Sequence, residues 1–366
     1  MVIQAAAEIQ HDVDQGEPQQ VLGLKPSPGR LFKYSKGLRL SILNELNYSS
    51  VLSADRFSKD LLCELCKLAA RLQMGELKVG NALSDKILAT AFFEPSTRTR
   101  LSFESAMLQL GGKTISVAEA ATTGIAKGES LVDIGQMFNS YANAVVVRHT
   151  QQEAIQELST YLRIPLINGG NGSDEHPTQA LADWYAILKW KPEIGFKTLD
   201  NSEKLNLGIV GTPGSMRTVK SFILLALLFK ENIKKITIIS ELADPLGSEV
   251  QDFVNKSPIP IQVIHDLQKV VSNLDVIYMN GIAWLGDGYR TLGRRFRLDK
   301  ESKLKPGAVI LHPLARKEEL SFTLDDTEHN LYFNQADGAV YIRQALLLSL
   351  FKRLDLVPEG LAGKQG

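Results

Sequence analysis

The chain has 366 residues, of which 44% are hydrophobic and 22% charged, the composition of an ordinary globular protein long enough for two domains. Its 41 lysines and arginines balance 41 aspartates and glutamates, so no overall positive field attracts nucleic acid or an anionic membrane. The longest apolar run, from Phe222 to Phe229, is too short to span a bilayer and predicts a buried helix.

The N-terminal stretch mixes Gln, Gly, Pro and charge without periodicity, which predicts a flexible extension over residues 1–36. It has no basic-then-apolar signal pattern, and its acidic residues are atypical of a transit peptide. The two cysteines, Cys63 and Cys66, exclude a disulfide framework and indicate a reducing compartment. Because they lie in an amphipathic helical run, we interpret them as small buried side chains rather than a redox or zinc pair. These features predict a cytoplasmic protein.

From residue 87 onward, apolar extended runs alternate with helical patterns. The first series of expected strands covers 87–93, 114–118, 144–148 and 165–168. The helices expected between and after them cover 97–110, 129–141, 152–161 and 176–190. The second series of strands covers 207–210, 236–239, 261–264, 276–279 and 308–311. Strands that are apolar on both faces and alternate with helices are typical of parallel sheets covered by helices.

The sequence therefore predicts an α/β protein with two doubly wound parallel-sheet domains joined by helices. We expect the first domain to cover residues 37–185 and the second to cover 186–338. A strongly apolar helix near the C-terminus, assigned to 339–356, is expected to pack back on the first domain.

Ligands of open α/β sheets bind beyond the carboxyl ends of the strands, where helices begin with free N–H groups. The first strand is followed by Glu94-Pro95-Ser96-Thr97-Arg98-Thr99-Arg100. Ser96 can cap the next helix, the two threonines add hydroxyls, and the guanidinium of either arginine can bind a phosphate at two points. Capping explains Ser96 alone, whereas five consecutive phosphate-competent residues favour a phosphate site.

Two further strand ends carry polar side chains. Arg148 and His149 end a β-branched run, where the arginine either faces a ligand or pairs with a carboxylate at the domain edge. A glycine-rich loop leads to His176 and Pro177, and proline suits the first position of a helix. A histidine at a helix start stays neutral and can donate to a carbonyl oxygen, although it can also be a plain capping residue. Gln179, one turn further on, favours the functional interpretation.

The last strand is followed by His312-Pro313-Leu314, a turn that can present carbonyl groups to a ligand. Together these junctions supply phosphate donors, a cation, a neutral histidine and an amide. They include no nucleophile–base pair, no metal-ligand cluster and no Walker lysine. We therefore expect direct attack on an activated, phosphate-bearing carbonyl, with no metal and no cofactor.

These motifs, in this order, resemble the aspartate/ornithine carbamoyltransferase family, and its aspartate branch most closely. The matching motifs are S-T-R-T-R at 96–100, R-H at 148–149, H-P-T-Q at 176–179 and H-P-L at 312–314. The resemblance implies an enzyme that moves the carbamoyl group of carbamoyl phosphate to the amino group of an amino acid and releases phosphate.

The resemblance also implies a role for each matching residue. Four residues would hold the phosphate: Ser96, Thr97, Arg98 and Thr99. Three would polarise the carbamoyl oxygen and stabilise the oxyanion: Thr99, Arg148 and His176. Two would orient the carbamoyl nitrogen: Gln179 and the carbonyl of Leu314.

Arg217 would bind the α-carboxylate of the acceptor. Lys127 matches a mobile-loop lysine that reaches the neighbouring subunit's site, and Thr123 lies where the family has a serine. The family forms catalytic trimers, so a homotrimer with shared active sites is expected. Its partners would be carbamoyl phosphate and an amino acid, with no nucleic acid and no membrane.

The sequence departs from the aspartate pattern at the second substrate. Gly281 and Ala283 stand where aspartate enzymes have an Arg and a Gln that bind the side-chain carboxylate of aspartate. An unpaired carboxylate in a desolvated site is costly. We therefore expect poor aspartate binding unless a nearby arginine reaches in: Arg290, Arg294 or Arg295.

Two other positions differ from the family. Thr212 stands where aspartate enzymes carry an Asp, and Ala315 replaces a proline that follows a cis peptide bond. A cis bond before alanine costs more than one before proline, so the sequence does not place the Leu314 carbonyl.

The acceptor therefore stays open between aspartate and a different amine, such as a diamino acid in specialised metabolism. A catalytically silent paralogue with a binding or assembly role is a second alternative, because the Arg and Gln that bind the aspartate side chain are missing. A dinucleotide-binding oxidoreductase is a third, because Gly208, Gly211 and Gly214 follow a strand. Their spacing is weak support, and the next strand ends at Ser240-Glu241, later than the usual acidic position.

Overall fold

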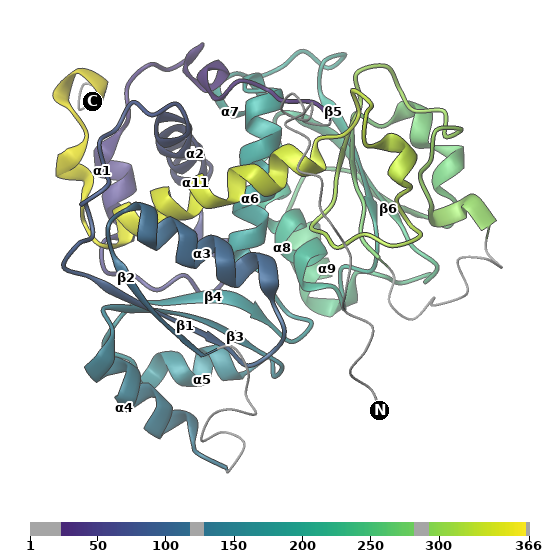
Figure 1. The fold of residues 1–366 in the computed structure, drawn as a ribbon. Helices are drawn as coiled ribbons and strands as arrows, with labels where there is room; N and C mark the ends of the chain where they lie inside the picture. Colours follow the sequence, from purple (N-terminus) through teal and green to yellow (C-terminus); the bar gives the residue numbers. More distant parts are fainter. Residues whose placement is uncertain (1–22, 118–127, 282–292, 364–366) are drawn as a thin grey trace, which may run out of the picture.

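The first domain is built on a parallel sheet with the strand order β2-β1-β3-β4. The computed structural model describes residues 23–117, 128–281 and 293–363. The strands of this sheet are β1 (Ile87–Phe92), β2 (Lys113–Val117), β3 (Ala144–His149) and β4 (Leu166–Asn171). One face is covered by α3 (Thr97–Gln109), and the other by α4 (Leu131–Tyr141) and α5 (Ala154–Tyr161), as Figure 1 shows.

The second domain has a five-stranded parallel sheet in the order β7-β6-β5-β8-β9. Its strands are β5 (Leu205–Val210), β6 (Ile233–Ile239), β7 (Ile261–Ile264), β8 (Val276–Tyr278) and β9 (Val309–Leu311). Its helices include α8 (Arg217–Ala226) and α9 (Gly247–Asn255). The central strands are buried because their Ile, Leu and Val side chains point to both covered faces. Both predicted sheets and their parallel pairing are confirmed, with strand ends that differ from the expected ones by up to three residues.

Three long helices pack against one another. They are α2 (Lys59–Gln73), α6 (Pro177–Trp190) and α11 (Tyr332–Leu350). Helix α11 starts beside the second sheet and packs along α2, α3 and α6, which confirms that the C-terminal helix returns to the first domain (Figure 1). It begins seven residues before the predicted start at 339, because Tyr332 and Asn334 to Gln335 are already buried against the domain join. The described residues also form two short helices: α1 (Leu40–Leu43) and α7 (Glu193–Phe196).

Residues 23–36, which the sequence analysis placed in the flexible extension, contact the body of the protein. Leu31 is fully buried, and the Tyr34 hydroxyl donates to Glu193 Oε1 at 2.7 Å. Lys67 Nζ donates to Ser35 Oγ at 3.0 Å. The sequence did not predict these contacts because the segment is mostly polar, and a single apolar side chain such as Leu31 produces no periodic pattern. Both cysteines are buried and free, as expected.

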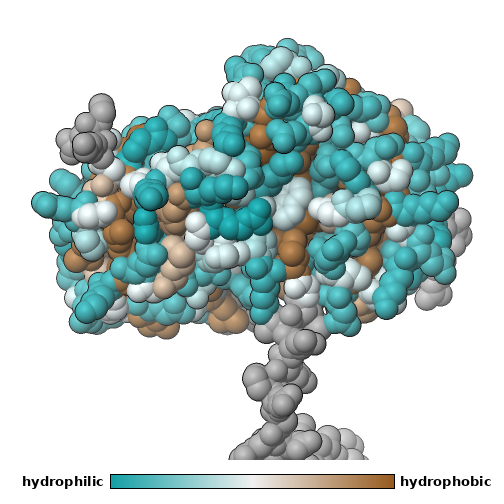
Figure 2. All heavy atoms as spheres, turned by 90° about the horizontal axis from the view of Figure 1, so that it is seen from above, coloured by the Kyte–Doolittle hydropathy of each residue, from teal (hydrophilic) through white to brown (hydrophobic). Residues whose placement is uncertain are grey.

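The surface seen in Figure 2 is mostly hydrophilic, with several separate apolar patches. Scattered apolar side chains of this kind are normal on a folded domain. Within the described residues, no helix is long and apolar enough to cross a membrane.

The contact between α6 and α8 depends on Trp184, which is fully buried at the domain join. Its ring stacks on Phe229 with centroids 4.5 Å apart and on Phe222 at 5.5 Å. We predict that Trp184→Ala lowers the free energy of unfolding by about 3–5 kcal/mol, because it leaves a large cavity. Guanidinium denaturation followed by circular dichroism measures this loss. Trp190→Ala, at the partly buried end of the same helix, is the control, and equal losses for both variants would contradict the prediction.

Candidate active site

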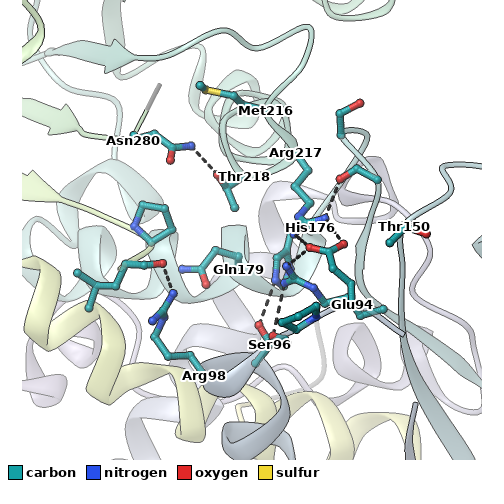
Figure 3. A pocket seen from close by; sticks show the side chains of 18 of the residues that line it. Glu94, Ser96, Arg98, Thr150, His176, Gln179, Met216, Arg217, Thr218 and Asn280 are labelled. Carbon is teal, nitrogen blue, oxygen red and sulfur yellow. Dashed lines mark hydrogen bonds and ion pairs between the residues drawn. The ribbon is translucent and has the colours of Figure 1, made fainter. Parts of the chain in front are cut away.

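A cavity of about 770 Å³ lies between the two domains, at the carboxyl ends of their strands. Polar and charged side chains from both domains point into it (Figure 3). The first domain contributes residues 94–99, 148, 150, 172–173, 176 and 179, and the second contributes 215–218, 280–281 and 313–314. Nine of the ten predicted site residues lie here, from Ser96 to Leu314. The tenth, Lys127, lies outside the described residues, as does Thr123.

The start of α3 forms the first wall of the cavity. Ser96 holds the N-cap position, but its side chain makes no capping hydrogen bond, and Arg148 Nη1 donates to its Oγ at 3.5 Å. Arg98 lines the cavity and donates to the Leu314 carbonyl. Arg100 points elsewhere and pairs with Glu104 at 3.3 Å. Of the two candidate arginines, only Arg98 therefore faces the cavity.

His176 lies at the start of α6 and is 3% exposed. Its Nε2 is 3.2 Å from Thr99 Oγ1, and its backbone N–H donates to Ser221 Oγ at 2.9 Å. Burial, together with the positive charges of Arg148 and Arg217, lowers the pKa of His176 well below its ordinary value. The imidazole is therefore neutral at physiological pH and can donate one hydrogen bond to a bound carbonyl.

Glu94 binds two of the cavity's arginines at once. Its Oε1 is 2.5 Å from Arg148 Nη2 and 2.5 Å from Arg217 Nη2, and its Oε2 accepts from Arg217 Nη1 at 3.0 Å (Figure 3). Arg217 Nη1 also donates to the carbonyl of Gly172 at 2.7 Å. Burial raises the pKa of Glu94, but the two arginines outweigh it and hold the pKa below its ordinary value. The carboxylate therefore stays charged and links the first domain to the second.

Glu94 had no predicted role, although it belongs to the motif that follows the first strand. Its place at a strand end, next to several arginines, could have indicated that it pairs with them. For Arg148, the sequence left open whether it faces a ligand site or pairs with a carboxylate. In the structure it lines the cavity and also pairs with Glu94. His149 lies outside the cavity lining: its ring packs edge-on against Phe93, and its Nδ1 accepts from the Gln151 N–H at 3.0 Å.

A buried carboxylate orients the amide of Gln179. Gln179 Nε2 donates to Asp183 Oδ1 at 2.7 Å, and Gln335 Nε2 donates to the same oxygen at 2.5 Å. Asp183 Oδ1 accepts both hydrogen bonds, so the Nε2 of Gln179 is turned towards Asp183. Its Oε1 is then left for the cavity, where it can accept an N–H from a substrate. Burial raises the pKa of Asp183 to about 7, against the hydrogen bonds that lower it.

The turn after β9 completes the cavity wall. His312 Nδ1 accepts from the Leu314 N–H at 2.8 Å, and the His312 N–H donates to Gln335 Oε1 at 2.9 Å. The peptide bond between Leu314 and Ala315 is cis, although its second residue is alanine and not proline. Leu314 lines the cavity, and its carbonyl accepts from Arg98.

The remaining wall comes from the second domain. Asn280 Nδ2 donates to Thr218 Oγ1 at 2.9 Å, and Gly281 lies beside it (Figure 3). Of the arginines that the sequence suggested as replacements, Arg294 pairs with Asp299 and Glu301, and Arg295 is exposed. The third, Arg290, lies outside the described residues, as does Ala283.

Thr212 is buried and lies 3.1 Å from Ser240, hydroxyl to hydroxyl, outside the cavity lining. The glycines of the same loop serve packing: a side chain at Gly208 would collide with Leu274, and one at Gly214 would meet the backbone of Leu246 at 2.9 Å. This packing accounts for the glycine spacing without a dinucleotide. Within the residues that the structure describes, no group of His, Cys, Asp and Glu side chains could hold a metal ion.

Two parallel-sheet domains with an arginine-lined cavity between them define the architecture of a two-domain α/β protein. Two family models match the chain: the carbamoyl-P binding domain of aspartate/ornithine carbamoyltransferases over residues 49–189, and their Asp/Orn binding domain over 203–350. The chain belongs to the aspartate/ornithine carbamoyltransferase family, and it is a carbamoyltransferase.

The similar proteins come from its aspartate branch. The aspartate carbamoyltransferase catalytic subunit of Picrophilus torridus is 37% identical over 82% of this chain and 98% of that protein. That of Methanobrevibacter smithii is 37% identical over 74% of this chain and 84% of that protein. A crystal structure of aspartate transcarbamoylase from Trypanosoma cruzi in complex with phosphate matches with a TM-score of 0.75 and 30% identity, over 84% of this chain and 97% of that one.

The titration of Asp183 gives a pH-dependent prediction. Its folded pKa of about 7 exceeds the ordinary value of 3.8, so between these values the native protein holds a proton that the unfolded chain lacks. The free energy of unfolding therefore falls as pH rises from 4 to 7, by up to about 1.4 kcal/mol per pH unit. Asp183→Asn has no such titration, so its stability relative to wild type should rise over this range and level off above pH 7. Guanidinium denaturation at several pH values measures the free energy of unfolding of the wild type and of the variant. Parallel pH curves for the two proteins would contradict the raised pKa of Asp183.

Proposed function

We propose that this carbamoyltransferase takes its carbamoyl group from carbamoyl phosphate and transfers it to the amino group of an α-amino acid. The observation that carries the proposal is the convergence of Arg98, Arg148 and His176 on one cavity at the carboxyl ends of two sheets. Such a cavity combines cations for a phosphate with a neutral donor for a carbonyl oxygen.

The phosphate end of the substrate suits the start of α3. Ser96, Thr97 and Thr99 offer hydroxyl groups, and Arg98 offers two parallel N–H donors. The first N–H groups of the helix add their partial positive charge. Because Ser96 makes no capping bond and Arg98 makes no salt bridge among the described residues, both side chains are available to a phosphate.

The carbamoyl carbonyl would then lie between Thr99, Arg148 and His176. The amine attacks the carbonyl carbon, a C–N bond forms, and the oxyanion is stabilised by these three donors. When the C–O bond to phosphate breaks, the phosphate leaves and can take up the proton that the amine loses. Gln179 Oε1 and the Leu314 carbonyl accept the N–H groups of the carbamoyl nitrogen, which fixes the plane of the group for attack.

Arg217 is the residue proposed for the α-carboxylate of the acceptor. In the structure its guanidinium already binds the carboxylate of Glu94 at two points, which shows that it can hold such a group. The relatives named above act on aspartate, and one Trypanosoma cruzi structure contains carbamoyl aspartate and phosphate. The cavity of this chain offers no arginine at Gly281 for the aspartate side chain, which favours a different acceptor.

A homotrimer with shared active sites, a contribution of Lys127 from the neighbouring subunit and a cytoplasmic location complete the proposal by analogy with the family. The departures at Gly281 and Ala283 also motivate the alternative of a catalytically silent paralogue. Turnover with any amino acid distinguishes an active carbamoyltransferase from a silent paralogue.

We predict that Arg98→Ala lowers kcat/KM for carbamoyl phosphate by about 100-fold or more, the scale of a lost charged hydrogen bond worth about 3 kcal/mol. Phosphate release, measured with a mixture of amino acids as acceptors, gives the rate. Arg100→Ala is the matched control, because Arg100 pairs with Glu104 outside the cavity. Near-normal activity of Arg98→Ala would contradict the donor site, and a wild-type protein without turnover would support the silent paralogue.

A further inference from the structure

A carboxylate lies directly behind Gly281 in the cavity wall. A Cβ atom placed on Gly281 would have three nearest neighbours, all on one side chain: Glu319 Oε1 at 3.4 Å, Cδ at 3.5 Å and Oε2 at 3.6 Å. Gly281 itself lines the cavity. Among the described residues, Gly281 therefore lies between the acceptor end of the cavity and Glu319.

Glu319 is an incompletely bonded buried acid. It is 1% exposed, and its Oε1 accepts from His312 Nε2 at 2.9 Å and from the Lys317 N–H at 2.9 Å. Its Oε2 has no hydrogen-bond partner among the described residues. A buried carboxylate oxygen in this state is costly unless a donor satisfies it.

The residues around Glu319 leave its negative charge uncompensated. Burial raises the pKa of Glu319, but the hydrogen bonds from His312 and Lys317 outweigh it, so the pKa lies below its ordinary value and the group is ionised. Burial lowers the pKa of His312, so that ring is neutral at physiological pH. The nearest arginine in the chain, Arg316, is committed to Asp325 and Tyr332.

The neighbouring polar group on the cavity wall also presents an oxygen. Asn280 uses its Nδ2 to bind Thr218, which leaves its Oδ1 without a hydrogen bond among the described residues (Figure 3). Among the described residues, the acceptor end of the cavity thus has an anion behind Gly281 and an amide oxygen at Asn280. These groups suit a hydrogen-bond donor that carries a positive charge.

We propose that the acceptor is an α-amino acid with a positively charged amine on its side chain, and that the negative charge of Glu319, directly behind Gly281 in the cavity wall, attracts this amine. This inference rests on the proposed function, because it places the acceptor's α-carboxylate on Arg217. The side-chain amine is a recognition element and not the nucleophile: it is protonated when Glu319 attracts it and has no lone pair to donate. The α-amine attacks the carbamoyl carbon, the bond to phosphate breaks, and phosphate and one proton are released.

Pairs of acceptors that differ in one group test this directly. The wild-type protein is given carbamoyl phosphate with 2,3-diaminopropionate against 2-aminobutyrate, with 2,4-diaminobutyrate against norvaline, with ornithine and with aspartate. We expect kcat/KM for the best diamino acid to exceed that of its neutral counterpart at least about tenfold, with aspartate below both. The scale is that of one hydrogen bond between charged groups. Mass spectrometry and NMR of the product should place the carbamoyl group on the α-nitrogen.

Two variants connect the preference to the named residues. Glu319→Gln should reduce the diamino preference to about threefold or less, because the charge is lost while the shape is kept. Gly281→Arg should reverse the order, lowering diamino turnover and raising aspartate turnover at least about tenfold, since the new guanidinium pairs with Glu319 and faces the acceptor. Gly281→Ala adds volume without charge: its Cβ contacts Glu319 at 3.4 Å and longer, so diamino turnover should stay unchanged or fall, and aspartate turnover should not rise as it does in Gly281→Arg.

The outcomes separate this inference from the proposed function. If no acceptor yields phosphate, the proposed function fails. If carbamoyl transfer occurs but aspartate or the neutral amino acids match the diamino acids, the function stands and the cationic acceptor is overturned. Carbamoylation of the side-chain nitrogen would also overturn it. Should Glu319→Gln fail to fold, as a melting curve would show, the wild-type panel and Gly281→Arg still decide.

Discussion

The ion pairs of Glu94 with Arg148 and Arg217 are the interaction on which the arrangement of the site depends. Two guanidinium groups in one partly buried cavity repel each other strongly, and a carboxylate between them turns this repulsion into attraction. Glu94 and Arg148 come from the first domain, and Arg217 comes from the second. The same contacts therefore hold the two domains at the separation that forms the cavity. They also keep both arginines extended towards the place where a substrate anion binds.

Around this centre, the polar groups of the cavity are held by buried neighbours and not by solvent. His176 is fixed from behind by Ser221, and Gln179 is fixed by Asp183, which also binds Gln335 on α11. Gln335 in turn binds the backbone of His312. The C-terminal helix thus connects the helix that carries His176 with the turn that carries Leu314. A site held in this way binds a small planar donor without first reorganising its side chains.

The donor half and the acceptor half of the cavity differ in how closely their residues match the family motifs. The predicted donor residues that the structure describes all line the cavity, although Ala315 stands where the family has a proline. The acceptor half has lost a cation at Gly281 while keeping the buried acid behind it. Removing one partner of such a pair leaves the other with an unsatisfied charge, so the ligand becomes the natural partner. Under the proposal above, acceptor choice follows from one backbone position and one carboxylate.

The sequence by itself determined the fold class, the parallel pairing within each domain and most of the donor residues. It could do so because alternating apolar runs and strand-end motifs are local patterns, and because the carboxyl ends of parallel strands meet at one edge. It left open whether Arg148 faces a ligand or pairs with a carboxylate, and it gave no role to Glu94. Only the tertiary structure decided these points, along with the burial of Leu31 and the place of Glu319 beside Gly281. Each depends on which side chains meet in the folded chain, and contacts between residues far apart in the sequence, such as Glu94 and Arg217, leave no periodic signal in a single chain.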